Sequence, residues 1–281
     1  MSSGISFVWD GRPDAAERLE DEMFMGIGES VPEVVEDQDE ETAEDQDGQE
    51  RPRTIIGAVA ARRDGSLLGL AEVYEEPEGD RAARVQGLYG PRMARRIATG
   101  YYDQLPPTDE EFDVFVGLYR HAAQGAGGAG YRTLRFSGMD TGVDGRAATE
   151  LNADVCRELA REWSAEPATW QPPDGLPDVP VQQRPGPGLT LAAPDAEISL
   201  GLVGCGSHLN ASEGIRHHTT APRVLAALLA HLLTCLRRDH PDVTELTISE
   251  FDDEVVRRAL PLAGLRIGAR FMEYELPLTP A

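Results

Sequence analysis

The spacing of apolar residues in the last third of the chain predicts a regular series of strands and helices. From residue 222 to 238, leucines recur at helical spacing and fall on one face: Leu225, Leu228, Leu229, Leu232 and Leu236. Shorter apolar runs on either side are typical of strands. The elements expected here are a strand at 215–220, a helix at 222–238, a strand at 243–249, a helix at 253–263 capped by Gly264, and a final strand at 265–276.

The first half shows similar patterns. Two β-rich runs, 54–61 and 67–74, flank the dipeptide Asp64-Gly65 and predict a hairpin. A third strand is expected at 83–89. Thr108 and Glu111 form a capping box ahead of a helix, which the glycine-rich tract 125–130 should end. The remaining expected elements are a strand at 6–9, a helix at 13–25, a strand at 131–136, and a helix striped by Leu151, Val155, Leu159 and Trp163.

A proline-rich segment separates the two halves. Residues 165–187 contain seven prolines and few large apolar side chains, which is typical of a linker. Beyond it, the runs 189–193 and 198–203 flank Pro194-Asp195 and predict another hairpin. We therefore expect an N-terminal domain at 1–164, a linker at 165–187 and a C-terminal domain at 188–281. Both halves run hairpin, strand, helix, strand, helix, so the expected class is α/β (α+β in some schemes), with a mixed sheet flanked by helices in each domain.

The charge of the chain is concentrated in one segment. The net charge is −23, and residues 29–50 hold 11 acidic residues and no arginine. This composition predicts a disordered insertion. A second interpretation is an acidic flap that concentrates cationic substrates. Either surface repels phosphate backbones, so we expect no nucleic-acid partner.

Residue usage excludes several chemistries. The chain has no lysine, which excludes a Schiff-base lysine and a P-loop lysine. Its three cysteines form no CxxC pair, so a metal site is not expected; Cys156 and Cys235 fall in helical patterns as core residues. The longest apolar run is too short to span a bilayer, and the N-terminus lacks a secretory signal. We expect a cytoplasmic protein that does not act at a membrane.

The C-terminal pattern resembles the GNAT superfamily of acyl-CoA N-acyltransferases. Asp253 stands where many members have an Asn that opens a helix, Leu260 where they have a Tyr, and Gly264-Leu265 where they have Gly-Phe. The similarity covers 198–276, and in the first half it rests on the order of elements. The whole resembles a tandem GNAT protein, with two GNAT-like units.

The resemblance implies acetyl-CoA or another acyl-CoA as co-substrate and no metal. In GNAT proteins acyl-CoA binds where two parallel strands splay apart, with its pyrophosphate on a glycine-containing loop at the start of the long helix. Here Arg223 and Leu225 replace the usual glycines; leucine would crowd the diphosphate, while Arg223 could bind phosphate with two hydrogen bonds. The residues expected to bind the coenzyme are Thr219, Thr220, Ala221, Arg223, Val224, Leu225 and Ala226.

The catalytic candidates lie on both sides of the same helix. His217 and His218 point to opposite faces of a strand, and an imidazole is suited to accepting a proton from an ammonium group. Glu250 and Asp253 follow the next strand, where capping of a helix is their alternative role. In the first half, Arg92, Arg95 and Arg96 occupy the place of a phosphate loop but lack its glycine spacing.

Two functions remain open from the sequence. The first is an acyl-CoA-dependent N-acetyltransferase that acts on a small-molecule amine by direct transfer. The alternative is a non-catalytic GNAT-like protein whose altered coenzyme cleft binds a partner, a second copy in a homodimer, or another ligand.

Overall fold

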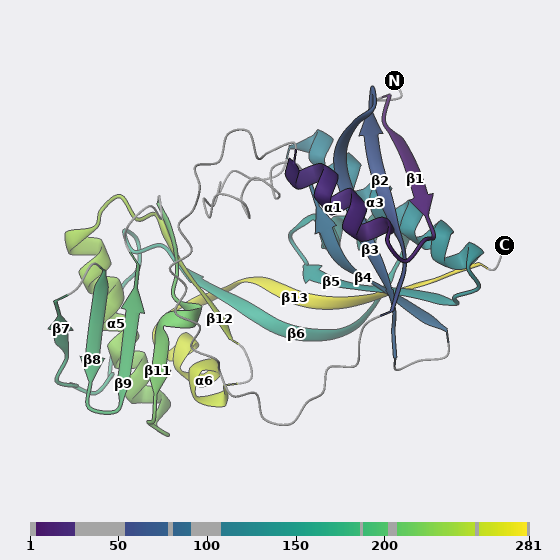
Figure 1. Cartoon of the computed structure of the whole chain (residues 1–281). Helices are drawn as coiled ribbons and strands as arrows, with labels where there is room; N and C mark the ends of the chain where they lie inside the picture. Colours follow the sequence, from purple (N-terminus) through teal and green to yellow (C-terminus); the bar gives the residue numbers. More distant parts are fainter. Residues whose placement is uncertain are drawn as a thin grey trace. The chain divides into compact units, whose positions relative to one another are not determined.

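The chain folds into two compact units in a computed structural model that describes residues 4–25, 54–77, 81–90, 108–185, 188–201, 207–250 and 253–279. Unit 1 comprises Met1–Arg157 and Glu273–Ala281, and unit 2 comprises Glu158–Met272. Both units combine helices with sheets of mixed strand direction, so the predicted α/β class is confirmed (Figure 1).

Unit 1 follows the chain almost in order. Its elements are β1 (Ser6–Asp10), α1 (Ala15–Met25), β2 (Ile55–Arg63), β3 (Ser66–Glu75), β4 (Ala82–Tyr89), α3 (Asp109–Gly128), β5 (Thr133–Met139), α4 (Val143–Leu151) and the start of β6 (Asp154–Ala165). The sheet order is β1-β2-β3-β4-β5-β13-β6, in which β13 (Arg266–Pro277) is the last strand of the chain.

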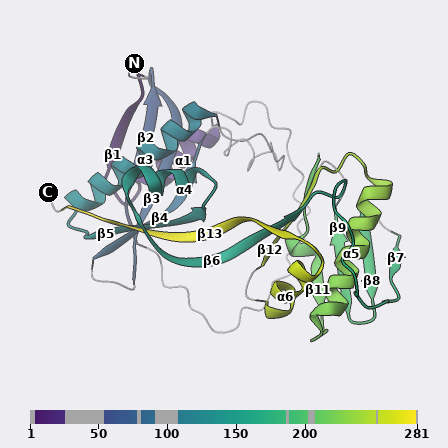
Figure 2. The ribbon, with the colours of Figure 1, turned by 180° about the vertical axis from the view of Figure 1, so that it is seen from behind.

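Two helices cover opposite faces of the unit 1 sheet, as the two views of the ribbon show (Figures 1 and 2). Met23 of α1 packs with Leu70 of β3. Val114 and Leu118 of α3 lie against the neighbouring residue, Gly69, whose position faces the other way. Burial of both faces accounts for the nearly continuous apolar sequences of β2 and β3.

Unit 2 is built around the leucine-rich helix. Its elements are β7 (Gln182–Arg184), β8 (Leu189–Ala193), β9 (Ala196–Leu200), β10 (His208–Asn210), a 3₁₀ turn (Ser212–Gly214), β11 (Ile215–His217), α5 (Pro222–Asp239), β12 (Glu245–Glu250) and α6 (Glu254–Leu262). One sheet has the order β11-β9-β8-β7, while β10 and β12 pair with each other and β12 pairs with β6. The predicted apolar face of α5 forms the centre of the core: Leu225, Leu228, Leu229, Leu232 and Leu236 are all fully buried.

Local signals in the sequence are confirmed where they are strongest. Asp64 and Gly65 both adopt positive φ, 51° and 87°, and join β2 to β3 as the hairpin requires. Thr108 accepts a hydrogen bond from the Glu111 backbone N–H at 3.3 Å, and the Glu111 carboxylate accepts one from the Thr108 N–H at 2.7 Å. The capping box therefore forms in both directions.

The helix predicted over 151–163 is wrong. Helix α4 ends at Leu151, Asn152 adopts the left-handed conformation with φ 55°, and residues from Asp154 onward form β6, which also places Cys156 in a strand. Apolar residues four apart lie on one face of a strand as well as of a helix, so the spacing could not separate the two.

The glycine-rich tract does not end its helix at residue 125. Helix α3 continues to Gly128, because the chain packs closely there: a Cβ added to Gly125 would come 2.1 Å from the Trp9 ring. These glycines permit close packing of the helix, and the turn follows at Gly130, with φ 90°.

The two units do not follow the predicted domain limits. Glu273–Ala281, predicted with the C-terminal domain, belongs to unit 1, and the proline-rich segment belongs to unit 2. That segment is fixed to unit 2 by Trp170, which is buried and donates from Nε1 to the Ala263 carbonyl at 2.9 Å.

Candidate functional site

The residues predicted to form the site lie in unit 2, around the junction of β11, α5 and α6. Two of them meet: His217 Nε2 lies 2.7 Å from Asp253 Oδ2. His217 Nδ1 lies 3.1 Å from the carbonyl oxygen of Thr219. Both partners are hydrogen-bond acceptors, so each ring nitrogen is engaged within the protein. Held in this way, His217 has no free nitrogen to take a proton from a substrate.

Asp253 also caps helix α6. Its Oδ1 accepts hydrogen bonds from the N–H groups of Val255 and Val256, each at 2.9 Å. Partial burial raises the pKa of Asp253, but the hydrogen bonds from Val256 and His217 outweigh it, and the net pKa is lowered. The capping role that the sequence offered as an alternative is therefore present in the structure.

Glu250 lies apart from this pair. It is 3% exposed, and its Oε2 accepts a hydrogen bond from Trp163 Nε1 at 2.6 Å. Its Oε1 lies 3.3 Å from Arg257 Nε. These bonds tie β12 to β6 and α6. His218 is exposed and lines a pocket on the sheet.

The predicted coenzyme loop is largely occupied by internal contacts. Ala221 donates its N–H to Thr219 Oγ1 at 3.1 Å, and Arg223 donates from its guanidinium to the Gly175 carbonyl. The side chains of Leu225 and Ala226 are fully buried in the core. Leu225 therefore points inward rather than into the mouth of the loop. Thr220 is exposed, and Val224 donates its N–H to the Ala221 carbonyl at 3.0 Å.

Unit 1 contains a second group of titratable residues, which the sequence did not single out. Glu72 of β3 is 5% exposed, and its Oε2 accepts a hydrogen bond from the Tyr74 hydroxyl at 2.7 Å. Burial, with Glu20 of α1 beside it, raises the pKa of Glu72 to about 7. Burial also raises the pKa values of Tyr74 and Tyr89. A carboxyl group with a pKa near neutrality can take up or release a proton at physiological pH.

The position of Glu72 depends on a glycine in the neighbouring strand. Glu72 stands opposite Gly87 of β4, and a Cβ at residue 87 would lie 2.6 Å from Glu72 Oε2. Only a residue without a side chain leaves room for the carboxyl group in this position.

The same part of β4 lies beside a separation in the sheet. β4 and β5 are parallel and pair only from Ala82↔Thr133 to Arg84↔Arg135, although β4 continues to Tyr89 and β5 to Met139. Gly87 thus belongs to the part of β4 that has parted from β5, and Glu72 borders this separation. The sequence signal for Glu72 was available: it is the single charged residue in the otherwise apolar run 67–74.

Several predicted features lie outside the described residues. These are the acidic insertion 29–50 and the arginines Arg92, Arg95 and Arg96. Within the described ranges, no helix is long and apolar enough to cross a membrane, and no cluster of three or more metal-binding side chains occurs.

Comparison with known proteins places the chain beside one family of solved structures. No family model and no curated protein matches. A tandem GNAT protein from the clavulanic acid biosynthesis pathway is 14% identical, with a TM-score of 0.44 over 99% of both chains. A GCN5-related N-acetyltransferase from Sphaerobacter thermophilus is 14% identical, with a TM-score of 0.38 over 98% of both chains. A GNAT-family acetyltransferase from Colwellia psychrerythraea is 10% identical, with a TM-score of 0.44 over 78% of this chain and 85% of that one.

All three are GNAT proteins. The resemblance to this superfamily, including its tandem form, is thus found again among solved structures. With TM-scores below 0.5, the similarity carries no conclusion about the co-substrate or the acceptor, so the function of this chain must be inferred from its own residues.

Proposed function

We propose that the protein is an acyl-CoA-dependent N-acyltransferase that transfers the acyl group directly to a small-molecule amine, and that unit 1 carries the reaction. The observation that supports this most is Glu72, a buried carboxyl group with a pKa of about 7, beside the separation of β4 and β5. The GNAT resemblance implies that acyl-CoA binds where two parallel strands part in this way.

Glu72 fits the proton transfer that the reaction needs. An amine enters as an ammonium ion and attacks only after losing a proton, which the Glu72 carboxylate accepts. The amine nitrogen then forms a bond to the thioester carbonyl carbon, the carbon–sulfur bond breaks, and the thiolate of CoA leaves. The pair of carboxyl groups, Glu72 and Glu20, also favours a cationic acceptor electrostatically.

The residues predicted in unit 2 suit this role less well. Both nitrogens of His217 are engaged with acceptors, and Glu250 is held by Trp163 and Arg257. A catalytic role for His217, His218, Glu250 and Asp253 stays a prediction, and so does coenzyme binding at 219–226. The second unit therefore serves as the built-in comparison for tests of the first.

A direct assay tests the proposal. The protein is incubated with acetyl-CoA, or a longer acyl-CoA, and a panel of primary amines and polyamines, and release of the CoA thiol is followed. We expect thiol release that depends on the amine. Acyl-CoA at 100 times its dissociation constant should also stabilise the fold by about 2.7 kcal/mol, measured as a rise in melting temperature.

The non-catalytic alternative predicts a different result. If no amine in the panel supports thiol release and no acyl-CoA at millimolar concentration raises the melting temperature, the acyltransferase proposal is wrong. A melting-temperature rise without thiol release would favour a protein that binds acyl-CoA without transferring its acyl group.

A further inference from the structure

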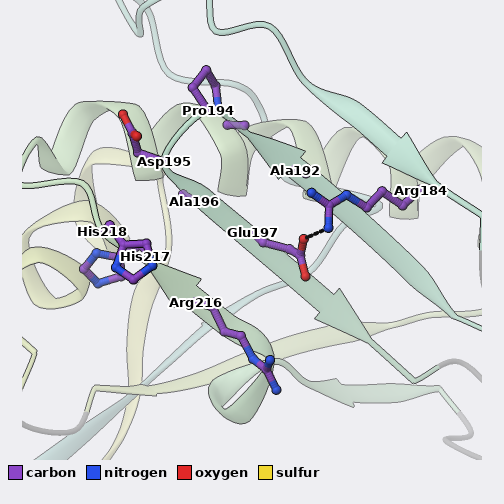
Figure 3. A pocket seen from close by; sticks show the side chains of 10 residues that line it. Arg184, Ala192, Pro194, Asp195, Ala196, Glu197, Arg216, His217 and His218 are labelled. Atoms are coloured by element: carbon purple, nitrogen blue, oxygen red, sulfur yellow. Dashed lines mark ion pairs between the residues drawn. The ribbon is translucent and has the colours of Figure 1, made fainter.

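Unit 2 contains a pocket that is separate from the features considered so far. It has a volume of about 300 Å³, at the lower end of the range for small-molecule sites. It opens on the sheet β11-β9-β8-β7 and ends at the hairpin between β8 and β9 (Figure 3). Its lining residues are Arg184, Ala192, Ala193, Pro194, Asp195, Ala196, Glu197, Arg216, His217 and His218.

Strand register places the charged lining residues on one face. Arg216 of β11 pairs directly with Glu197 of β9, which pairs with Ala192 of β8. Directly paired residues project from the same face of a sheet. The adjacent residues, Ile198 and Leu191, are fully buried and face the core around α5. The pocket therefore has a small, flat floor at Ala192, with charged side chains around it.

Two cationic or potentially cationic side chains in this pocket lack partners. Arg184 is paired with Glu197 at 2.5 Å, and in Figure 3 the two side chains point toward each other. Arg216 and His218 are exposed and, among the described residues, make no side-chain hydrogen bond or ion pair. The guanidinium fork of arginine matches the geometry of a carboxylate or phosphate group.

The end of the pocket is held in place before any ligand arrives. The carbonyl of Asp195 accepts hydrogen bonds from the N–H groups of His218 at 2.9 Å and Thr219 at 3.2 Å. These bonds fix the β8–β9 hairpin to the end of β11. A site that is already formed loses little conformational entropy on binding.

The overall charge of the chain makes this local arrangement informative. A protein with a net charge of −23 repels anions from most of its surface. An unpaired arginine beside an unpaired histidine, over a preformed pocket, is therefore a place where an anion would bind specifically rather than through the general field.

We propose that this pocket binds a small molecule through an anionic group, a carboxylate or a phosphate, which Arg216 holds with His218 beside it. The ligand lies on the sheet face between Arg216 and the β8–β9 hairpin. The proposal concerns unit 2 alone and does not depend on acyl transfer in unit 1.

Calorimetric titration of the full chain tests the proposal with two probes, inorganic phosphate and succinate, at constant ionic strength set with chloride. We expect saturable binding of one of them at one site per chain, and the probe that binds identifies the group as phosphate or carboxylate. Arg216→Gln should weaken this binding by about tenfold or more, because a hydrogen-bonded charge is lost.

Arg258→Gln is the matched control. Arg258 is an exposed arginine on α6 of the same unit and does not line the pocket, so its substitution changes the net charge equally. The control should leave the affinity unchanged. The proposal is overturned if neither probe shows saturable binding, or if Arg258→Gln weakens binding as much as Arg216→Gln. Far-ultraviolet circular dichroism of both variants establishes that any loss of affinity does not come from unfolding.

Discussion

The two units share a local arrangement but complete it differently. In unit 1, β4 and β5 are parallel and pair over three positions, from Ala82↔Thr133 to Arg84↔Arg135, before they part. In unit 2, β10 and β12 are parallel and also pair over three positions, from His208↔Glu245 to Asn210↔Thr247. Beyond this point the chain of unit 2 turns at Ser212–Gly214 and continues as β11 in the other sheet.

Side chains bridge the separation in unit 2. Ser249 donates its N–H to Ser212 Oγ at 2.8 Å, and His217 bonds to Asp253 at 2.7 Å. In the described part of unit 1, no hydrogen bond or ion pair joins residues 85–89 to residues 136–139; the buried Glu72 borders that separation instead. The same strand topology can therefore hold a reactive carboxyl group in one unit and be closed by internal bonds in the other.

The sharpest test of this difference compares one residue from each unit. Glu72→Gln keeps the size of the side chain and its bond from Tyr74 but removes the base, so turnover should fall by about 10²- to 10⁴-fold. His217→Asn should change turnover much less. Thiol release from acyl-CoA measures both, with the exposed Glu75→Gln on the same strand as control. A larger loss in His217→Asn than in Glu72→Gln would move the reaction to unit 2.

The pH dependence of turnover provides a second test. Because the pKa of Glu72 is raised to about 7, protonation below that pH should remove the base, and kcat/KM should fall about tenfold per pH unit. The Glu72→Gln variant should lose this dependence. A wild-type profile that stays flat down to pH 5 would contradict the assignment.

The raised pKa has a matching effect on stability. The folded protein binds the Glu72 proton more tightly than the unfolded chain, so this group makes folding less favourable as pH rises from 4.5 through 7. Relative to wild type, Glu72→Gln should therefore melt at a higher temperature at pH 8 than it does at pH 5, as thermal unfolding at the two pH values will show.

Gly87 should tolerate no side chain. In Gly87→Ala the new methyl group would meet Glu72 Oε2 at 2.6 Å, and we expect a loss of about 1–3 kcal/mol in unfolding free energy together with reduced turnover. Chemical denaturation measures the change. Gly128→Ala is the control, since nothing lies within 4 Å of its added Cβ at the end of α3. Equal effects of the two substitutions would count against close packing at Gly87.

The smallest effect is expected at the bridge in unit 2. Asp253→Asn keeps an oxygen that can cap α6 but weakens the bond to His217, which should cost about 1 kcal/mol. The lowered pKa of Asp253 means that its stabilising effect is present above its unfolded pKa, 3.8, and is lost as the pH falls through the folded value. The variant should lack this part of acid destabilisation. Urea unfolding at pH 3 and pH 7 measures it, and an unchanged pH dependence would remove the role assigned to the bridge.

Much of the fold could be predicted because its signals are local. The hairpin at Asp64-Gly65, the capping box at Thr108 and the buried face of α5 each depend on residues a few positions apart. Prediction failed for β6, where apolar residues four apart suit a strand and a helix equally. It also failed at Gly125, where contact with Trp9, distant in sequence, determines the backbone.

The candidate site was harder to predict than the fold. The sequence brought His217 and Asp253 to notice, and the structure joins them, but it also shows that both histidine nitrogens are engaged. Glu72 drew no attention because an acid in an apolar strand gains meaning only from what surrounds it. Its raised pKa comes from burial and from Glu20, which lies in a different element.

The sequence by itself therefore determined the order of most elements, the α/β class and the resemblance to tandem GNAT proteins, since periodicity and turn chemistry are encoded within short segments. Tertiary structure alone decided that Glu273–Ala281 belongs to unit 1, that Glu72 lies over Gly87, and that the separation in unit 2 is bridged. Desolvation and hydrogen bonding depend on groups brought together from distant parts of the chain, so the chemistry of a carboxylate or an imidazole cannot be known before those neighbours are in place.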